Sequence, residues 1–271
     1  MTDTKKFSRR AAIGGGLSLL AAGGVALNAT PAAAATTVRV MTWNIHGESV
    51  SIAGIASVIK QYGVDVATLQ EVHRREDQDQ VALLAQSLNL HISDNVHFGS
   101  ADRVGPCDAP WTGSRAGWAG NAVFSRYPIV ERVTKPLSPA SQDCPVKRAM
   151  SGVRLNVAGK ALRVFTTHFT PGASAAALNL RHAQTTTVVN YLTQSGPLLL
   201  TGDLNDTPVS WVRNRIIDAG FADAGARHAD DPTLGSARID YIFYKGATVT
   251  GGFVPSPGYS DHRPVIMDVV V

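Results

Sequence analysis

The sequence predicts one α/β or α+β domain in which helices and sheets pack as layers. Three observations support this prediction. Of the 271 residues, 44% are hydrophobic and only 17% are charged, so the chain can bury a full core and lacks the composition of a disordered protein. Helix-like and strand-like segments alternate in the first third, and hairpin-like strand pairs follow. This mixture is typical of layered domains.

The individual elements follow from periodicity and turn residues. Residues 38–45 and 64–69 are apolar runs typical of buried strands, and residues 52–62 between them have helical periodicity. Residues 98–118 lose periodicity and collect Gly, Pro, Cys and Trp, which predicts a long loop. The remaining expected elements are helices over 78–88, 173–192 and 210–219, and strands over 121–124, 129–133, 150–157, 162–168, 198–202, 239–244, 249–254 and 265–270.

The first 35 residues differ in kind from the rest. A basic head that contains the pair Arg9 and Arg10 precedes a Gly/Ala-rich apolar stretch over 11–27, and small residues follow at 32–35. This pattern resembles a twin-arginine export signal with a cleavage site. A membrane anchor is the alternative, but the stretch is short and Gly-rich compared with the roughly 20 apolar residues that span a bilayer. We therefore expect an export signal over 1–35, a domain over 36–271 and a secreted protein.

The positive charge of the chain lies mostly in that segment. Residues 1–35 hold four of the 25 Lys and Arg residues and one of the 21 acidic residues, so residues 36–271 carry 21 basic and 20 acidic side chains, a net charge of +1. The sequence pI of about 9.2 is therefore no argument for nucleic-acid binding. The substrate class has to be inferred from the site.

Two cysteines, Cys107 and Cys144, lie in Gly/Pro-rich connecting sequence. Because an exported protein meets an oxidising compartment, we expect one disulfide between them, with two free thiols as the alternative.

Polar clusters follow several of the predicted strands. Asn44 lies at the end of the first strand, Glu71 directly follows a buried strand, and Asp203 and Asn205 follow another. A fourth cluster, residues 259–264, precedes the last strand. Taken singly, an Asp or Asn after a strand is usually a turn or cap residue.

Together and in this order, the clusters resemble the endonuclease/exonuclease/phosphatase superfamily. Two further segments, 167–169 and 238–242, also match its pattern, and the resemblance covers residues 38–271. It implies a four-layer α-β-β-α sandwich, with two mixed sheets face to face and helices outside. It also implies hydrolysis of a phosphate ester by water with the help of a divalent cation.

The resemblance assigns roles residue by residue. It places Asn44 and Glu71, with Asp261 nearby, at the metal, and oxygen donors of this kind suit Mg²⁺ or Mn²⁺ better than Zn²⁺. Ca²⁺ is a possible additional ion. A phosphodiester is anionic and needs its leaving oxygen stabilised, which a hard cation provides. The catalytic residues that the resemblance implies are His168, Asp203, Asn205, Asp240 and His262.

Within that set, Asp203 is expected to orient or deprotonate the attacking water, and Asn205 to hold a phosphate oxygen. Asp240 would pair with His262 and raise its basicity, which leaves His262 either as the base or as a phosphate-stabilising acid. His168 would donate to the phosphate in the transition state.

Three further residues lie near these motifs. Asn121 and Arg148 match positions that reach the phosphate in relatives, and each is equally compatible with a structural or solvated role. Arg181, on the helix after His168, is expected at the surface.

The sequence leaves the substrate open. A nuclease should line its groove with basic residues, and candidates lie around the long loop: Arg103, Arg115, Arg126, Lys147 and Arg148. A phospholipase C or sphingomyelinase should expose aromatic residues to a lipid surface, for which Trp111 and Trp118 are available. An extracellular nuclease is preferred, ahead of a lipid phosphodiesterase, a phosphomonoesterase and an inactive phospho-ligand-binding protein. We expect a monomer without a stable protein partner.

Overall fold

The computed structural model of this protein describes residues 35–47, 50–75, 78–104, 117–137 and 147–271. Residues Ala33–Val271 form one compact unit. Both cysteines lie outside the described residues, so the expected disulfide remains a prediction.

Sheet A is a mixed sheet of six strands. Its strands are β1 (Thr37–Asn44), β2 (Val66–Arg75), β3 (Val96–Val104), β4 (Gly117–Ser125), β11 (Thr248–Phe253) and β12 (Val265–Val270). They lie in the order β11-β12-β1-β2-β4-β3. β1 and β2 are parallel, and the other neighbours are antiparallel.

Sheet B has the same size and a similar pattern. Its strands are β5 (Ile129–Pro136), β6 (Ala149–Val157), β7 (Lys160–His168), β8 (Leu198–Asp203), β9 (Ala222–Asp223) and β10 (Asp240–Lys245). They lie in the order β5-β6-β7-β8-β10-β9. Here β7 and β8 form the parallel pair. The predicted hairpin between β6 and β7 is confirmed, since Val157 pairs with Lys160 across the turn.

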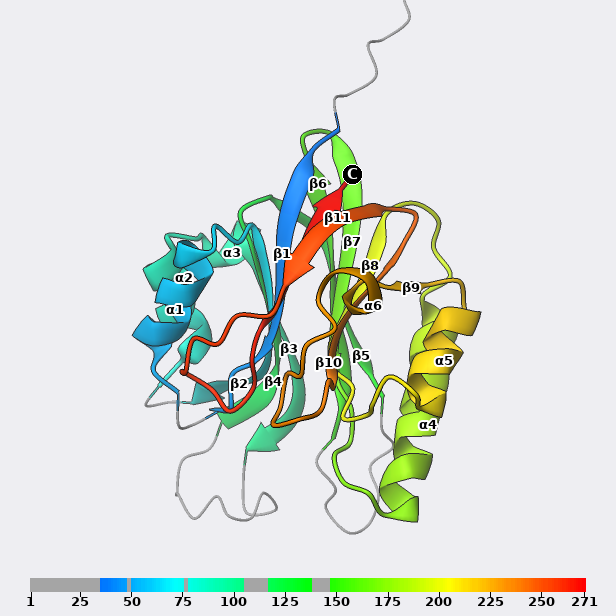
Figure 1. The fold of residues 1–271 in the computed structure, drawn as a ribbon. Helices are drawn as coiled ribbons and strands as arrows, with labels where there is room; N and C mark the ends of the chain where they lie inside the picture. Colours follow the sequence, from blue (N-terminus) through cyan, green and yellow to red (C-terminus); the bar gives the residue numbers. More distant parts are fainter. Residues whose placement is uncertain (1–34, 48–49, 76–77, 105–116, 138–146) are drawn as a thin grey trace, which may run out of the picture. The chain divides into compact units, whose positions relative to one another are not determined.

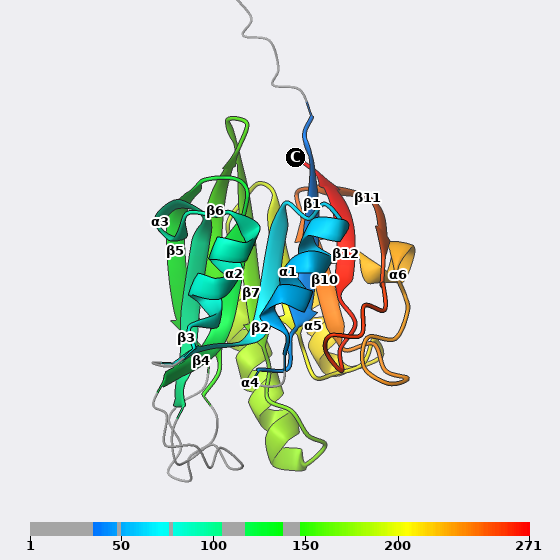
Figure 2. The same ribbon diagram turned by 90° about the vertical axis from the view of Figure 1, so that its left-hand side faces the viewer.

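Helices cover the outer faces of both sheets. The helices are α1 (Ile52–Gln61), α2 (Gln80–Leu88), α3 (Ile92–Asn95), α4 (Ala175–Tyr191), α5 (Trp211–Asp218) and α6 (Gly225–His228). Figures 1 and 2 show α1 and α2 outside sheet A, and Figure 1 shows α4 and α5 outside sheet B. The side chains at 51, 79, 174 and 210 cap the first turns of α1, α2, α4 and α5. None of the described helices has the length and hydropathy needed to cross a membrane.

The core is divided by these layers. Val40, Val123, Val153 and Leu199 belong to an apolar cluster between the two sheets, and two further clusters lie between each sheet and its helices. Alternation along each strand sends side chains to both clusters in turn. The four-layer α-β-β-α architecture predicted for the chain is thereby confirmed.

The parallel pairs β1–β2 and β7–β8 place polar side chains at one shared edge of the two sheets. Parallel strands end at the same side of a sheet, so β1 and β2 carry Asn44 and Glu71 to this edge of sheet A, while His168 and Asp203 pair in register at the ends of β7 and β8. Gly202 permits the close approach of those two strands. Its φ is +130°, and a Cβ there would lie 1.9 Å from the carbonyl oxygen of Thr167.

One predicted element is wrong. Residues 98–118 were expected as a loop, but β3 extends to Val104 and β4 begins at Gly117. Backbone pairing with β4 holds this polar edge strand, with a register shift between Ser100 and Asp102. Such pairing leaves little trace in side-chain hydropathy.

Candidate active site

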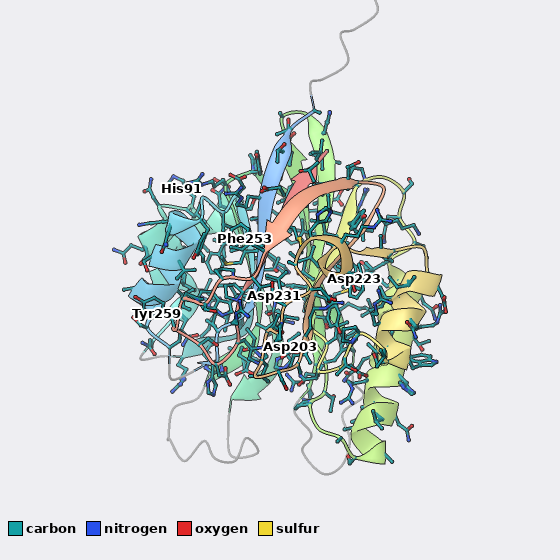
Figure 3. The ribbon with its side chains drawn as sticks, in the orientation of Figure 1. His91, Asp203, Asp223, Asp231, Phe253 and Tyr259 are labelled. Atoms are coloured by element: carbon teal, nitrogen blue, oxygen red, sulfur yellow. The ribbon has the colours of Figure 1, made fainter. Side chains whose placement is uncertain are left out.

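Asp203 is the centre of the polar cluster at the shared edge of the sheets (Figure 3). Its side chain is almost fully buried and accepts hydrogen bonds from the side-chain Nδ2 of Asn44 (3.1 Å) and the backbone N of Asn205 (2.7 Å). Nε2 of His168 lies 3.5 Å and Nε2 of His262 lies 3.8 Å from Oδ2 of Asp203. Side chains from three other segments, at the ends of β1 and β7 and before β12, therefore converge on one carboxylate.

The environment of Asp203 changes its proton affinity. Burial and the negative charge of Asp240 raise the pKa of Asp203 to about 7, against the lowering effects of His262 and of the hydrogen bonds from Asn205 and Asn44. A carboxyl group with a pKa near neutrality is suited to accept a proton from water.

His262 and Asp240 form a buried pair. Nδ1 of His262 donates to Oδ2 of Asp240 at 2.8 Å. Burial lowers the pKa of His262, but the hydrogen bond and the negative charge of Asp240, together with the charge of Asp203, raise it to about 9. His262 is therefore an imidazolium at neutral pH. Asp240 is the first residue of β10 and pairs in register with Asp203 on β8.

His168 has the opposite protonation. Its ring is buried between Asp203 and Glu71, with Nδ1 4.0 Å from Oε1 of Glu71. Burial holds the pKa of His168 well below its usual value, and the positive charges of Arg148 and His262 lower it further. His168 is therefore neutral, and two histidines of one site carry different charges.

Two site residues have left-handed backbones that non-glycine residues adopt rarely. Glu71 (φ +56°) lies in the register shift between Leu69 and Val72, where the bulge redirects its side chain. Asn205 (φ +50°) is held by its backbone N on Asp203 and by its Nδ2 on the carbonyl oxygen of Phe169 at 3.0 Å. Strained backbone of this kind concentrates at functional sites.

Asn44 and Glu71 lie together on the sheet A side of the cluster. Nδ2 of Asn44 donates to Oε1 of Glu71 at 3.1 Å, and Oδ1 of Asn44 accepts from the backbone N of His46. Asp261 lies on the rim, with its side chain 49% exposed and its Oδ1 3.4 Å from Nδ1 of His46. Of the three residues expected at a metal, two are in contact with each other, and the described contacts of Asp261 are with His46 and Ser260.

The structure gives Arg148, Asn121 and Arg181 different surroundings. Arg148 lies close enough for its charge to lower the pKa of His168. The Nδ2 of Asn121 is buried and donates to the carbonyl oxygen of Ala149 at 2.8 Å, beside Arg148 in the chain. Arg181 was expected at the surface, and this prediction is wrong, because the residue is only 3% exposed. Its guanidinium donates to the carbonyl oxygens of Thr170 and Gly172 and pairs with Asp206, which fixes the loop after β7.

Several positioning contacts were not predicted from the sequence. The hydroxyl of Ser260 donates to the carbonyl oxygen of Asn44 at 2.8 Å, and the indole Nε1 of Trp43 donates to the carbonyl oxygen of His262 at 2.9 Å. These bonds tie the loop before β12 to the end of β1. Ser260 lies in the cluster 259–264 and Trp43 directly precedes Asn44, so their positions beside the predicted site residues were the signal that the sequence offered.

The donor set fits a divalent cation of the hard type. Carboxylate and amide oxygens predominate, from Asn44, Glu71, Asp203 and Asp240, and Oδ1 of Asp240 is buried without a hydrogen-bond partner among the described residues. Ligand atoms of Asp203, Asp240 and His262 lie within 4.8 Å of one another. The arrangement therefore offers a cation position at Asn44 and Glu71, whereas a cation at Asp203 and Asp240 would compete with the imidazolium of His262.

Comparisons with known proteins agree with this geometry. The sequence model of the Endonuclease/Exonuclease/phosphatase family matches residues 41–262. The crystal structure of an endonuclease/exonuclease/phosphatase from Beutenbergia cavernae superposes with a TM-score of 0.76 at 27% identity, covering 86% of this chain and 71% of that one.

More distant structures share the fold. A mannosyl-6-phosphatase of Bacteroides thetaiotaomicron is 18% identical with a TM-score of 0.64, covering 86% of this chain and all of that one. The human Nocturnin catalytic domain with bound sulfate is 20% identical with a TM-score of 0.65, covering 86% and 94%. No curated protein matches the sequence significantly. From the family match and the converging site residues, the chain belongs to the Endonuclease/Exonuclease/phosphatase family of metal-dependent phosphoester hydrolases.

Proposed function

We propose that this protein is an Mg²⁺- or Mn²⁺-dependent phosphodiesterase that cleaves nucleic acid. The observation that carries the proposal is the convergence on Asp203 of a neutral histidine, His168, and a protonated one, His262. A base, a hydrogen-bond donor and a positive charge around one point are what water attack on a phosphate diester requires.

In the proposed mechanism, Asp203 accepts a proton from the attacking water, because its raised pKa makes it an effective base near neutrality. As the water oxygen bonds to phosphorus, the P–O bond to the leaving oxygen breaks. The imidazolium of His262, held by Asp240, stabilises the negative charge of the phosphate and gives its Nε2 proton to that leaving oxygen. His168 and Asn205 donate to the phosphate oxygens. Asn44 and Glu71 would hold the cation, which supplies charge neutralisation at the phosphate when bound.

Cationic rather than aromatic residues support the nucleic-acid substrate. Arg148 lies near His168, and Lys147 beside it is exposed, which suits a phosphate backbone. Trp118, the candidate for lipid contact, pairs in register with Arg74 on β2 and is 48% exposed, so a lipid phosphodiesterase stays as the alternative. Arg126 was expected to contribute to a basic groove. Instead it pairs with Asp65, which directly precedes β2 and stands six residues before Glu71.

Nicking of supercoiled plasmid in Mg²⁺ tests the proposal, with EDTA and a His262→Ala variant as controls and a His228→Ala variant matched for residue type away from the site. We expect nicking by the wild-type protein and by His228→Ala only. If folded protein hydrolyses bis-p-nitrophenyl phosphate but leaves plasmid and RNA intact, the nucleic-acid substrate is excluded. Release of phosphocholine from sphingomyelin, or of phosphate from a sugar monophosphate, would then identify the alternative classes.

We also propose that the protein is exported by the segment 1–35, which lies outside the described residues apart from Ala35. Its paired arginines support this proposal. Replacement of Arg9 and Arg10 by lysine should retain the protein inside the cell, and unchanged appearance in the medium would contradict twin-arginine export.

A further inference from the structure

A second candidate site lies on the outer face of sheet B, away from the catalytic edge. A groove of about 390 Å³ opens there between the edge strand β5 and the C-terminal end of α4, which is within the size range of small-molecule sites. Phe165 lines it and stands three residues before His168 on β7. Because side chains alternate along a strand, these two residues face opposite sides of sheet B. The groove is therefore separate from the catalytic cluster.

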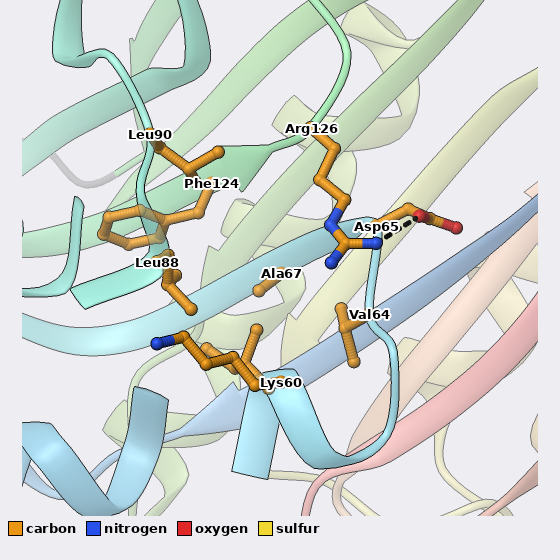
Figure 4. Close-up of a pocket in the computed structure, with 9 residues that line it drawn as sticks. Lys60, Val64, Asp65, Ala67, Leu88, Leu90, Phe124 and Arg126 are labelled. Carbon is orange, nitrogen blue, oxygen red and sulfur yellow. Dashed lines mark ion pairs between the residues drawn. The ribbon is translucent and has the colours of Figure 1, made fainter. Parts of the chain in front are cut away.

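A second cavity serves as a contrast. The pocket in Figure 4 lies under α1 and α2, where Leu88 and Phe124 face the ion pair of Asp65 and Arg126. Its volume of about 30 Å³ leaves room for roughly one water molecule. The groove on sheet B has room for a ligand.

The floor of the groove is aromatic because a glycine lies at its centre. Gly152 on β6 pairs in register with Val133 on one side and Phe165 on the other. The Phe165 ring leans over the glycine, where a Cβ would lie 2.3 Å from the ring carbon Cδ1. Tyr191, the last residue of α4, packs edge to face on Phe165 with ring centroids 6.2 Å apart. A planar ring can lie against this pair.

The next row of the sheet brings like charges together. Arg154 on β6 is the direct cross-strand partner of Arg163 on β7, an arrangement that is unfavourable without a counter-charge. Glu131 on β5 pairs with Arg154 at 2.6 Å, and Arg163 donates to the carbonyl oxygen of Ser195 at 3.2 Å. One carboxylate thus faces two guanidinium groups.

A third cation strengthens the positive field on the other side of the floor. Nζ of Lys135 lies 5.9 Å from the ring centroid of Tyr191. Around Gly152, the described side chains Arg154, Arg163 and Lys135 therefore outnumber the single acid Glu131. This balance favours an anionic ligand.

One polar atom at the groove also lacks its hydrogen bond. Gln194, just after α4, donates from Nε2 to the carbonyl oxygen of Tyr191 at 3.0 Å. Its Oε1 is buried and has no hydrogen-bond partner among the described residues. A ligand N–H group would satisfy this acceptor.

We propose that the groove binds a nucleoside monophosphate. The base would lie on Phe165 and Tyr191, with its amino group donating to Oε1 of Gln194, and the phosphate would neutralise the facing Arg154 and Arg163. Arginine pairs are suited to a phosphate because their planar guanidinium groups donate two parallel hydrogen bonds. The proposal adds a site to the protein and does not depend on the substrate of the catalytic cluster.

Chemical-shift mapping of the ¹⁵N-labelled domain in EDTA tests the proposal, with 5′-AMP, adenosine and inorganic phosphate as separate probes. We expect AMP to shift the backbone amides of Gly152 and residues 191–194. Adenosine and phosphate alone should each bind at least ~10-fold more weakly, since each makes only part of the contacts. The same AMP titration of His262→Ala should give an unchanged affinity at these amides.

A double variant tests the role of the two arginines in AMP binding. Arg154→Gln with Arg163→Gln should weaken AMP binding at these amides by ~10-fold or more, whereas Arg227→Gln on the exposed side of α6 should leave it unchanged. Thermal melting confirms that each variant is folded. Shifts confined to the amides around Asp203 and His262, AMP binding that the double variant leaves intact, or phosphate binding as tight as AMP would each overturn the proposal.

Discussion

Gln70 on β2 donates a hydrogen bond of 2.8 Å to the hydroxyl of Thr166 on β7, and so connects the two sheets directly beneath the catalytic cluster. The side chain is fully buried, and its Nε2 also donates to Oγ1 of Thr42 at 3.1 Å. Gln70 precedes Glu71, and Thr166 lies two residues before His168. This bond therefore sets the separation between the sheet A and sheet B halves of the site.

Replacement of Gln70 by leucine should reduce kcat by ~10²-fold, because a small misplacement of reacting groups has effects of this size. Thr201→Val is the matched control, since it removes another buried bond between the sheets, the one from Thr201 to Oγ1 of Thr68 at 2.8 Å. Both variants should melt at lower temperature, but Thr201→Val should retain most of kcat. Equal losses of kcat in the two variants would show that Gln70 has only a structural role.

Asp240→Asn should lower the pKa of His262, because the hydrogen bond and charge that raise it to about 9 are weakened while burial continues to lower it. As the pH rises, His262 of the variant would then lose its proton at a lower pH than His262 of the wild type. We expect kcat/KM of the wild type to rise through the Asp203 pKa near 7 and to fall near 9. In the variant the alkaline fall should move to lower pH, with an overall loss on the order of 10²-fold or more. An unmoved alkaline limb would exclude His262 as the acid.

Glu71→Gln should weaken Mg²⁺ or Mn²⁺ binding by at least ~10-fold, because it removes the charge from a ligand while it retains the shape. Isothermal titration with Mn²⁺ measures this loss directly. Asp261→Asn is the comparison, since Asp261 lies on the rim beside His46 and should have a smaller effect. If Asp261→Asn weakens binding as much as Glu71→Gln, then Asp261 is a direct ligand.

Asp223 should stabilise the fold through a buried ion pair. Its carboxylate accepts from Arg238 at 3.0 and 2.9 Å and from Arg213 at 3.1 Å, which anchors the segment before Asp240. Asp223→Asn removes the buried charge that Arg238 and Arg213 share and leaves Arg238 only the exposed Asp230, 2.7 Å from its Nε, as an ion-pair partner. The free energy of unfolding should therefore fall by about 3 kcal/mol. Urea unfolding at neutral pH measures this change, and a change below ~1 kcal/mol would contradict it.

The same pair predicts a pH dependence of stability. Burial raises the pKa of Asp223, but the hydrogen bonds and charges of Arg238 and Arg213 outweigh it and hold the pKa below the ordinary 3.8. A depressed carboxyl pKa contributes stability that is complete above the unfolded value and is lost as the pH falls through the folded value. Wild-type stability should therefore fall more steeply below pH ~4 than that of Asp223→Asn.

The sequence by itself determined most elements and pointed to residues that the fold brings together at the shared edge of the sheets. Apolar runs located β1, β8 and β12, because buried strands need continuous apolar side chains. Glu71 within β2 and Asp203 at the end of β8 stood out because they interrupt such runs. Local patterns could not locate β3, since a polar edge strand is held by backbone hydrogen bonds to its neighbour.

Only the tertiary structure decided which side chains meet. Arg181 carries the same charge as a surface arginine, and it is buried because three acceptors from the loops after β7 and β8 surround it. Asp203 and Asp240 are 37 residues apart in the numbering, and burial of Asp203, together with its pairing with Asp240 across β8 and β10, raises the pKa of Asp203 to about 7. Register and burial are properties of the packed sheets, and therefore proton affinities and the facing arginines of the groove arise only when distant strands come together.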